Sequence, residues 1–185
     1  VIDLFAGAGG LSTGLKSAGF KILGAVEADA TSAATYQMNH PNTKIFLSDI
    51  RRLTGTSLLK ELDIVRGELD LLTGCPPCQG FSTLRTKRRN VAEFDPRDEL
   101  VFEILRLTRS IRPQSIIFEN VPGFTLDQRF RKFCEELSKC GYSTKHAVLD
   151  ATNYGVPQRR RRLVLLCLRN SRPIPHNWSF PLKSE

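Results

Sequence analysis

The stretch VIDLFAGAGGLSTGL, residues 1–15, joins a short apolar run to a glycine-rich loop and then to a segment with helical character. A strand, a glycine loop and a helix in this order are typical of an open parallel sheet, which binds ligands at the carboxyl ends of its strands. Glycines in such a loop let the backbone approach the ligand closely. The stretch therefore predicts an α/β fold with a ligand site after the first strand.

The rest of the chain continues this alternation. Short runs rich in β-formers recur between segments of helical spacing, which indicates a parallel sheet with crossover helices. We therefore expect a doubly wound, mostly parallel sheet of seven strands. The expected strands are Val1 to Phe5, Ile22 to Glu27, Lys44 to Ser48, Leu69 to Thr73, Ser115 to Glu119, Thr144 to Asp150 and Leu163 to Leu168.

Two helices have a clear apolar face. One face carries Leu100, Ile104, Leu107 and Ile111, and the other carries Phe130, Phe133, Cys134 and Leu137. Residues spaced three or four apart share one side of a helix, so these side chains predict core packing. Asp95 and Pro96 are typical of an N-cap and a first helical position, and they predict the start of the first helix.

Composition narrows the class of protein. The chain has 185 residues, 41% of them hydrophobic, which suits one globular domain, and its formal net charge of +8 favours a polyanionic partner.

No apolar run is long enough to span a bilayer, and residues 1–10 lack the charged region of a signal peptide, so we expect no membrane partner. We expect a cytoplasmic, nucleoid-associated protein if bacterial and a nuclear one if eukaryotic. Five cysteines, an odd number, predict reduced thiols.

The first glycine loop predicts a nucleoside ligand. The dinucleotide pattern GxGxxG fails because Ser12 occupies the third glycine position, which removes support for a pyrophosphate. Glu27 ends the second expected strand, where it could accept hydrogen bonds from ribose hydroxyls, and Asp49 follows the third, where it could take an adenine amino group. S-adenosylmethionine fits this set better than a dinucleotide does. The alternative is a tight turn with Glu27 as a solvated carboxylate.

The stretch GCPPCQGFSTLRTKRRN, residues 74–90, leaves three interpretations of its cysteines open. A metal site would need two further ligands at suitable spacing, which the sequence does not offer, so we expect no metal. A redox dithiol of Cys75 and Cys78 is the second interpretation. The third is a nucleophilic Cys78, whose thiolate the cations at 87–89 could stabilise.

The fifth strand and the arginine run supply further candidates at the same sheet edge. The run IIFENV, residues 116–121, places Glu119 at the end of the expected fifth strand, and QRRRR, residues 158–162, leads into the last strand. Alternation along a strand points Arg160 and Arg162 to one face and Arg159 and Arg161 to the other. One pair could serve the site while the other meets solvent or phosphate. Glu119 could instead cap a helix or pair with an arginine.

Taken in order, VIDLFAGAGG, VEAD, SDI, GCPPCQGFS, DPRDEL, ENVPGF and QRRRR resemble the motif series of the C5-cytosine-specific DNA methyltransferases over nearly the whole chain. The resemblance implies a Rossmann-like, S-adenosylmethionine-dependent methyltransferase fold. It also implies double-stranded DNA as partner and a cytosine flipped out of the duplex as substrate.

The resemblance assigns roles to named residues. It implies that Cys78 attacks C6 of the cytosine, that Glu119 contacts N3 and the exocyclic amine, and that Arg160, with Arg162 next in the pattern, holds the base. The implied cofactor contacts are Phe5, Gly7, Gly9, Glu27, Asp49, Ile50 and Pro76. The cationic loop at 81–97 is expected to close over the extruded nucleotide, with DNA contacts from Ser82, Lys87, Arg88 and Arg89.

Two departures from the family pattern matter. Ala28 stands where some members carry an aromatic residue that packs on the adenine, so we expect that contact from Phe5. The family also continues beyond the arginine motif into a target-recognition region and two further motifs. We therefore expect residues 1–170 to form the catalytic and cofactor-binding domain, and 171–185 to be a tail or the start of that region. A second subunit or a further segment would carry target recognition.

Two other functions remain open from the sequence. One is a tRNA cytosine-5 methyltransferase of the related eukaryotic type, which uses a similar site. The other is a catalytically inactive regulatory homologue that binds S-adenosylmethionine or a partner. The family also gives the expectation of a role in restriction-modification.

Overall fold

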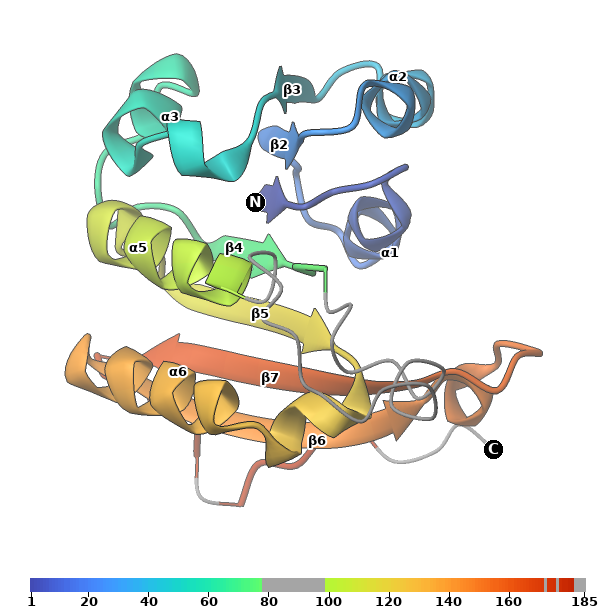
Figure 1. Ribbon diagram of the computed structural model, residues 1–185, viewed down its shortest axis with the longest axis vertical. Coiled ribbons are helices and arrows are strands. Elements are labelled where there is room, and N and C mark those ends of the chain that lie inside the picture. The colour runs from blue at the N-terminus through green and yellow to red at the C-terminus, as the bar shows by residue number, and fades with distance from the viewer. Residues whose placement is uncertain (78–98, 172, 176, 182–185) are drawn as a thin grey trace, which may run out of the picture.

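The computed structural model describes residues 1–77, 99–171, 173–175 and 177–181 (Figure 1). Cys78, which the family resemblance implies as the nucleophile, lies outside the described residues. The same holds for the four expected DNA contacts and for the expected helix start, namely Ser82, Lys87, Arg88, Arg89, Asp95 and Pro96.

Seven strands form one sheet in the order β3-β2-β1-β4-β5-β7-β6. The strands are β1 (Ile2–Leu4), β2 (Gly24–Glu27), β3 (Lys44–Leu47), β4 (Leu71–Gly74), β5 (Ser115–Asn120), β6 (Tyr142–Asp150) and β7 (Arg161–Arg169). The first five run parallel, whereas β7 pairs antiparallel with both β5 and β6. The predicted doubly wound, mostly parallel sheet of seven strands is confirmed.

The strand order creates a ligand crevice between β1 and β4. The chain builds outward from β1 to β2 and β3, and then returns to place β4 on the other side of β1. Open α/β sheets bind their ligands at such a switch point, outside the carboxyl ends of the strands. The fold therefore fixes where a site is to be sought.

Helices cover the sheet on both faces (Figure 1). The helices are α1 (Gly10–Ser17), α2 (Ala30–Asn39), α3 (Gly55–Glu61), α5 (Val101–Ile111) and α6 (Gln128–Lys139), with short 3-10 turns η1 (Ile50–Arg52), η3 (Pro122–Leu126) and η4 (Ala151–Tyr154). The figure groups α3, α5 and α6 on one side of the sheet and α1 and α2 on the other. The molecule thus has three layers.

Alternation along the strands builds a separate core on each face. Ile116 and Phe118 of β5 join the large cluster that α5 and α6 cover, while Ile117 between them packs toward Leu15 of α1. Side chains alternate across a strand, so neighbouring residues supply different layers. The two predicted amphipathic helices are confirmed, because Ile104, Leu107, Ile111, Phe130, Phe133 and Leu137 are all buried.

Each of the seven strands differs from its predicted bounds by one or two residues at one end or both, as three of them illustrate. β1 stops at Leu4 because Phe5 has a φ of 58°, a left-handed conformation that cannot continue a strand. β2 begins at Gly24 rather than Ile22. β7 is longer than predicted because it pairs along its whole length with β6, from Arg161 to Arg169.

The described part of the tail lies against β6. The Ile174 amide donates to Ser143 Oγ at 3.1 Å, and the Tyr154 hydroxyl donates to the Pro181 carbonyl at 2.9 Å. Lys145 Nζ donates to the Trp178 carbonyl and lies 5.7 Å from the centre of its ring. Among the described residues, no helix combines the length and apolar character that a bilayer crossing requires.

Candidate functional site

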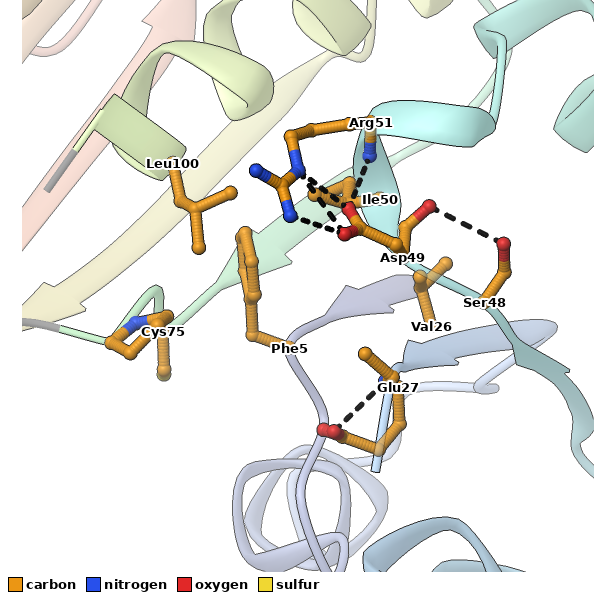
Figure 2. Close-up of a pocket in the computed structure, with 11 residues that line it drawn as sticks. Phe5, Val26, Glu27, Ser48, Asp49, Ile50, Arg51, Cys75 and Leu100 are labelled. Atoms are coloured by element: carbon orange, nitrogen blue, oxygen red, sulfur yellow. Dashed lines mark hydrogen bonds and ion pairs between the residues drawn. The ribbon is translucent and has the colours of Figure 1, made fainter. Parts of the chain in front are cut away.

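A cavity of 410 Å³ opens at the carboxyl ends of β1 to β4, at the switch point of the sheet (Figure 2). Its volume lies within the range of small-molecule and cofactor sites. The described residues that line it are Phe5, Val26, Glu27, Ala28, Ser48, Asp49, Ile50, Arg51, Cys75, Pro77 and Leu100. Four of the seven expected cofactor contacts are in this set, namely Phe5, Glu27, Asp49 and Ile50.

Phe5 enters the cavity from a strained backbone. A left-handed φ is uncommon for a residue with a bulky side chain, and such conformations gather at functional sites. The turn ends β1 and leaves the half-buried ring on the cavity wall, where Figure 2 shows it. The contact with the adenine that the sequence analysis expects from this ring stays a prediction.

Glu27 is held rigidly by backbone amides. One carboxylate oxygen accepts from the Gly7 amide at 2.8 Å, and the other accepts from Ala28 and Asp29 at 2.9 and 2.8 Å. A carboxylate offers about four acceptor positions, so one position on the oxygen that faces Gly7 remains for a ligand hydroxyl. The sequence placed Glu27 correctly at the strand end but did not predict this network.

Asp49 is engaged with its neighbour Arg51. The guanidinium of Arg51 lies 2.5 Å from one carboxylate oxygen, and the Arg51 amide donates to the other at 2.9 Å. These hydrogen bonds lower the pKa of Asp49 to about 2, so the side chain is a carboxylate at neutral pH. Arg51 also lines the cavity, although the sequence analysis did not single it out.

The three remaining expected cofactor contacts do not line the cavity. Gly7 lies next to it through its bond to Glu27, with a φ of 55°. Gly9 has a φ of 93°, and a Cβ built there would lie 2.4 Å from His40 Nε2, so packing as well as backbone shape requires glycine. Pro76 is buried, and its neighbours Cys75 and Pro77 line the cavity instead.

Ser12, which stands at the third glycine position of the dinucleotide pattern, belongs to a buried hydrogen-bond network. Its hydroxyl is fully buried, lies 2.6 Å from Asp3 Oδ2, and lies 2.8 Å from the Tyr36 hydroxyl. Burial raises the pKa of Asp3 to about 6, while the bond from Ser12 opposes the shift. Sequence reasoning missed this chain of three side chains, and the serine at a glycine position was the signal that could have found it.

Glu119 forms the second half of the site. It ends β5 next to Asn120, and its Oε1 lies 2.8 Å from Arg162 Nε and 3.8 Å from an Arg160 guanidinium nitrogen. β7 runs antiparallel beside β5, which carries Arg162 toward the carboxyl end of its neighbour. The two arginines that alternation assigned to one face therefore both reach the same carboxylate.

Cys75 connects the two halves. It lines the cavity, and it follows Gly74 of β4 just as Glu119 follows Phe118, the partner of Gly74 on β5. Burial raises the pKa of the Cys75 thiol, and the charge of Glu119 raises it further. A raised pKa disfavours the reactive thiolate, so this thiol is a poor nucleophile. The sequence analysis considered Cys75 only as a possible partner of Cys78 in a metal site or a redox pair.

Comparison with known proteins identifies the family. The model of the C-5 cytosine-specific DNA methylases matches residues 1–184. The type II methyltransferase M.XorII of Xanthomonas oryzae is 38% identical over 180 residues, which cover 94% of this chain and 41% of that protein. M.AquIA of Picosynechococcus is 35% identical over 177 residues, which cover 90% of this chain and 70% of that protein.

Solved structures share the fold. A proposed DNA modification methyltransferase encoded within an E. coli prophage superposes with a TM-score of 0.78 at 30% identity, covering 92% of this chain and 46% of its own. DNMT2 of Spodoptera frugiperda superposes with a TM-score of 0.74 at 24% identity over 100% of this chain and 53% of its own, and it supports the fold alone. The chain thus spans about half the length of these proteins. It belongs to the C-5 cytosine-specific DNA methylase family.

Proposed function

We propose that the chain is the catalytic and cofactor-binding part of a DNA (cytosine-5-)-methyltransferase that uses S-adenosylmethionine. One observation carries the proposal: Cys75 belongs to the cavity wall and lies beside Glu119, because the preceding residues, Gly74 and Phe118, are partners on β4 and β5. A cavity for a methyl donor and a carboxyl group for the base therefore lie side by side. Methyl transfer needs this arrangement, because the donor and the acceptor carbon must be held in contact.

The cavity residues suit S-adenosylmethionine, which supplies an electrophilic methyl group when it is bound. Phe5 and Ile50 offer apolar surfaces for the adenine. Glu27 has an acceptor position free for a ribose hydroxyl, and the Asp49 carboxylate suits the adenine amino group. Gly7 and Gly9 form the adjacent turn of backbone. Ser12 in place of the third glycine of the dinucleotide pattern removes support for a pyrophosphate, which favours a nucleoside over a dinucleotide.

The roles of the residues around the cytosine follow from the chemistry of that nucleobase. Its C5 carbon is a poor nucleophile until a thiolate adds at C6 and converts C5 into an enamine carbon. We assign that addition to Cys78. Glu119 would contact N3 and the exocyclic amine, stabilising the charge that develops through N3, with Arg160 and Arg162 orienting the carboxyl group and the base. After methyl transfer a base removes the C5 proton, and the bond to Cys78 breaks.

Target recognition is assigned to polypeptide beyond this chain. M.XorII and the prophage protein are more than twice as long as the stretch they share with it. On β7, Val164, Leu166 and Leu168 are only half buried, whereas Leu163, Leu165 and Cys167 on the opposite face are buried. A further segment or a second subunit that covers this row would also read the DNA sequence. By itself the chain would bind DNA without sequence choice and methylate it poorly. The names of the relatives favour a role in restriction-modification.

Covalent trapping tests the proposal. The chain is incubated with S-adenosylmethionine and duplex DNA that contains 5-fluorocytosine, whose fluorine blocks the final elimination and leaves the protein attached to C6. We expect a denaturant-resistant adduct in the unmodified chain and none in Cys78→Ser. The remaining polypeptide of a longer relative is supplied in a second arm, because the chain alone is expected to react slowly.

The outcomes separate the alternatives. An adduct that survives in Cys78→Ser would contradict the assignment of the nucleophile. Trapping on fluorinated tRNA and not on DNA would replace the proposal with tRNA methylation. No adduct on either nucleic acid, in the presence of the added polypeptide, would leave a regulatory homologue that binds without catalysis.

A further inference from the structure

Besides the Thr13 hydroxyl of α1, which donates to the Gly9 carbonyl at 3.0 Å, three side chains distant in sequence hold the glycine loop at 7–9. Glu27 accepts from the Gly7 amide at 2.8 Å, Asn39 Nδ2 donates to the Ala8 carbonyl at 2.9 Å, and His40 Nε2 lies 3.0 Å from the Gly9 carbonyl. Each of the three successive loop residues therefore has one backbone group bound to a side chain. A carbonyl oxygen only accepts, so Nε2 carries the hydrogen in the bond from His40.

The three side chains flank α2. Glu27 ends β2, three residues before the first helical residue, and it also binds the amide of the N-cap residue, Asp29. Asn39 is the last helical residue, and His40 is the C-cap. The helix thus spans the loop as a brace, with the carboxylate of the cavity wall at one end and two loop contacts at the other.

The His40 contact is built into the core. The ring is 2% exposed, and its centre lies 4.6 Å from that of Tyr36. A Cβ on Gly9 would overlap it, so the imidazole fills the space that the glycine leaves. Within the described residues His40 Nδ1 has no hydrogen-bond partner, so the polar interactions of the ring are those of Nε2 with the Gly9 carbonyl and with the Thr13 hydroxyl of α1.

We infer that Asn39 and His40 are positioning residues that hold the glycine loop in the shape that binds the cofactor. The inference rests on the proposed function, because it takes the loop to face S-adenosylmethionine. Two glycines with positive φ have many accessible conformations, and fixing them at the moment of binding would weaken affinity. The contacts from Asn39 and His40 order the loop when the protein folds, so ligand binding does not have to order it.

Asn39 allows a clean test because it is exposed. Asn39→Ala removes the bond to the Ala8 carbonyl and leaves the core untouched. Gln37→Ala is the matched control, since Gln37 is an exposed amide on the same helix that donates to the Pro41 carbonyl at 3.0 Å, away from the loop. One hydrogen bond corresponds to an affinity change of about twofold to tenfold.

Two readouts follow the loop with and without ligand. In Asn39→Ala we expect faster amide hydrogen exchange at residues 7–9 and S-adenosylmethionine binding weaker by about twofold to tenfold, measured by calorimetry. Gln37→Ala is expected to change neither, and both variants are expected to unfold at nearly the same temperature. A merely structural role for Asn39 would lower stability without the local change in exchange.

His40 provides the second pair of variants. His40→Gln retains a side-chain N–H that can reach the Gly9 carbonyl, and it is expected to keep most of the affinity that His40→Ala loses. Equal loop exchange and equal affinity in Asn39→Ala and Gln37→Ala would overturn the inference. If the unmodified chain bound no S-adenosylmethionine while Asn39→Ala still freed the loop, the proposed function would fall and the brace would stand.

Discussion

Arg162 Nε lies 2.8 Å from Glu119 Oε1, while the guanidinium of Arg160 lies 3.8 Å from the same atom. Arg162 belongs to β7 and Arg160 immediately precedes that strand, whereas Glu119 comes from the neighbouring strand β5. The closer and less exposed arginine orients the carboxylate, since its side chain is 29% exposed against 51% for Arg160. Arg160 is left more exposed at the mouth of the site.

This difference predicts a graded loss of trapping. We expect Arg162→Ala to slow adduct formation with fluorinated DNA by roughly a hundredfold, because the group that faces the developing charge loses its orientation. Arg160→Ala should cause a smaller loss. Arg131→Ala is the control, because Arg131 is 86% exposed on α6 and pairs only with Glu135 among the ion pairs of the described residues. Equal rates in Arg162→Ala and Arg131→Ala would contradict the assigned role.

Cys75 is predicted to resist alkylation in the folded protein. Burial and then the charge of Glu119 raise the pKa of its thiol, and thiolate is the reactive form. Iodoacetamide at about pH 8, near the ordinary pKa of a thiol, should leave Cys75 unlabelled natively and label it after unfolding, as peptide mass spectrometry would show. Glu119→Gln removes the charge and should speed the labelling. Rapid native labelling, with no change in Glu119→Gln, would contradict this account.

Local patterns predicted the fold and the edge on which the site lies. Seven apolar runs predicted seven strands, and the carboxyl ends of parallel strands meet at one edge, so Glu27, Asp49 and Glu119 fall together. The spacing of Ile104 and Leu107 likewise predicted α5. A period of 3.6 residues specifies the buried face of a helix from local sequence alone.

Contacts that depend on register and packing could not be predicted. Cys75 reaches Glu119 because β4 pairs with β5 so that Gly74 lies opposite Phe118, a register that neither strand encodes alone. The bond between Ser12 and Tyr36 joins two helices whose relative position arises only in the folded protein. Phe5 ends β1 through a backbone angle that its residue type disfavours.

Glu27→Gln is predicted to weaken cofactor binding. The carboxylate accepts three backbone hydrogen bonds, and the amide would turn a donor toward at least one of these N–H groups. Hydrogen bonds to charged groups contribute about 1.5–3 kcal/mol, so we expect S-adenosylmethionine affinity to fall by about tenfold to a hundredfold. Calorimetry would measure this. Glu61→Gln, which alters an exposed pair with Lys44, is the control and should bind normally.

Gly7 and Gly9 should respond differently to alanine. Both have positive φ, which costs an alanine roughly 1–2 kcal/mol, but only at Gly9 would the new Cβ overlap His40. Gly9→Ala is therefore expected to be destabilised more than Gly7→Ala, as measured by urea unfolding. Gly7→Ala has space for a methyl group and should lose mainly cofactor affinity, because the strained φ would shift the loop amide that binds Glu27. Equal unfolding midpoints for the two variants would contradict the packing argument.

Asp3 predicts a pH dependence of stability with a definite sign. Burial raises its pKa from 3.8 to about 6, so the folded protein holds the proton more tightly than the unfolded chain does. The contribution to stability is therefore complete below about pH 4 and is lost as the pH rises through about 6. A shift of this size corresponds to roughly 3 kcal/mol.

Asp3→Asn tests this directly, because the amide imitates the neutral carboxyl group at every pH. Its unfolding free energy, measured with urea, should exceed that of the unmodified chain near neutral pH, and the difference should shrink as the pH falls from about 6 to about 4. Asp29→Asn should instead be less stable than the unmodified chain near neutral pH, because hydrogen bonds from Ser32 lower the pKa of Asp29, and this difference should shrink only as the pH falls below about 4. A difference between Asp3→Asn and the unmodified chain that stayed constant over this range would show that Asp3 does not titrate within the fold.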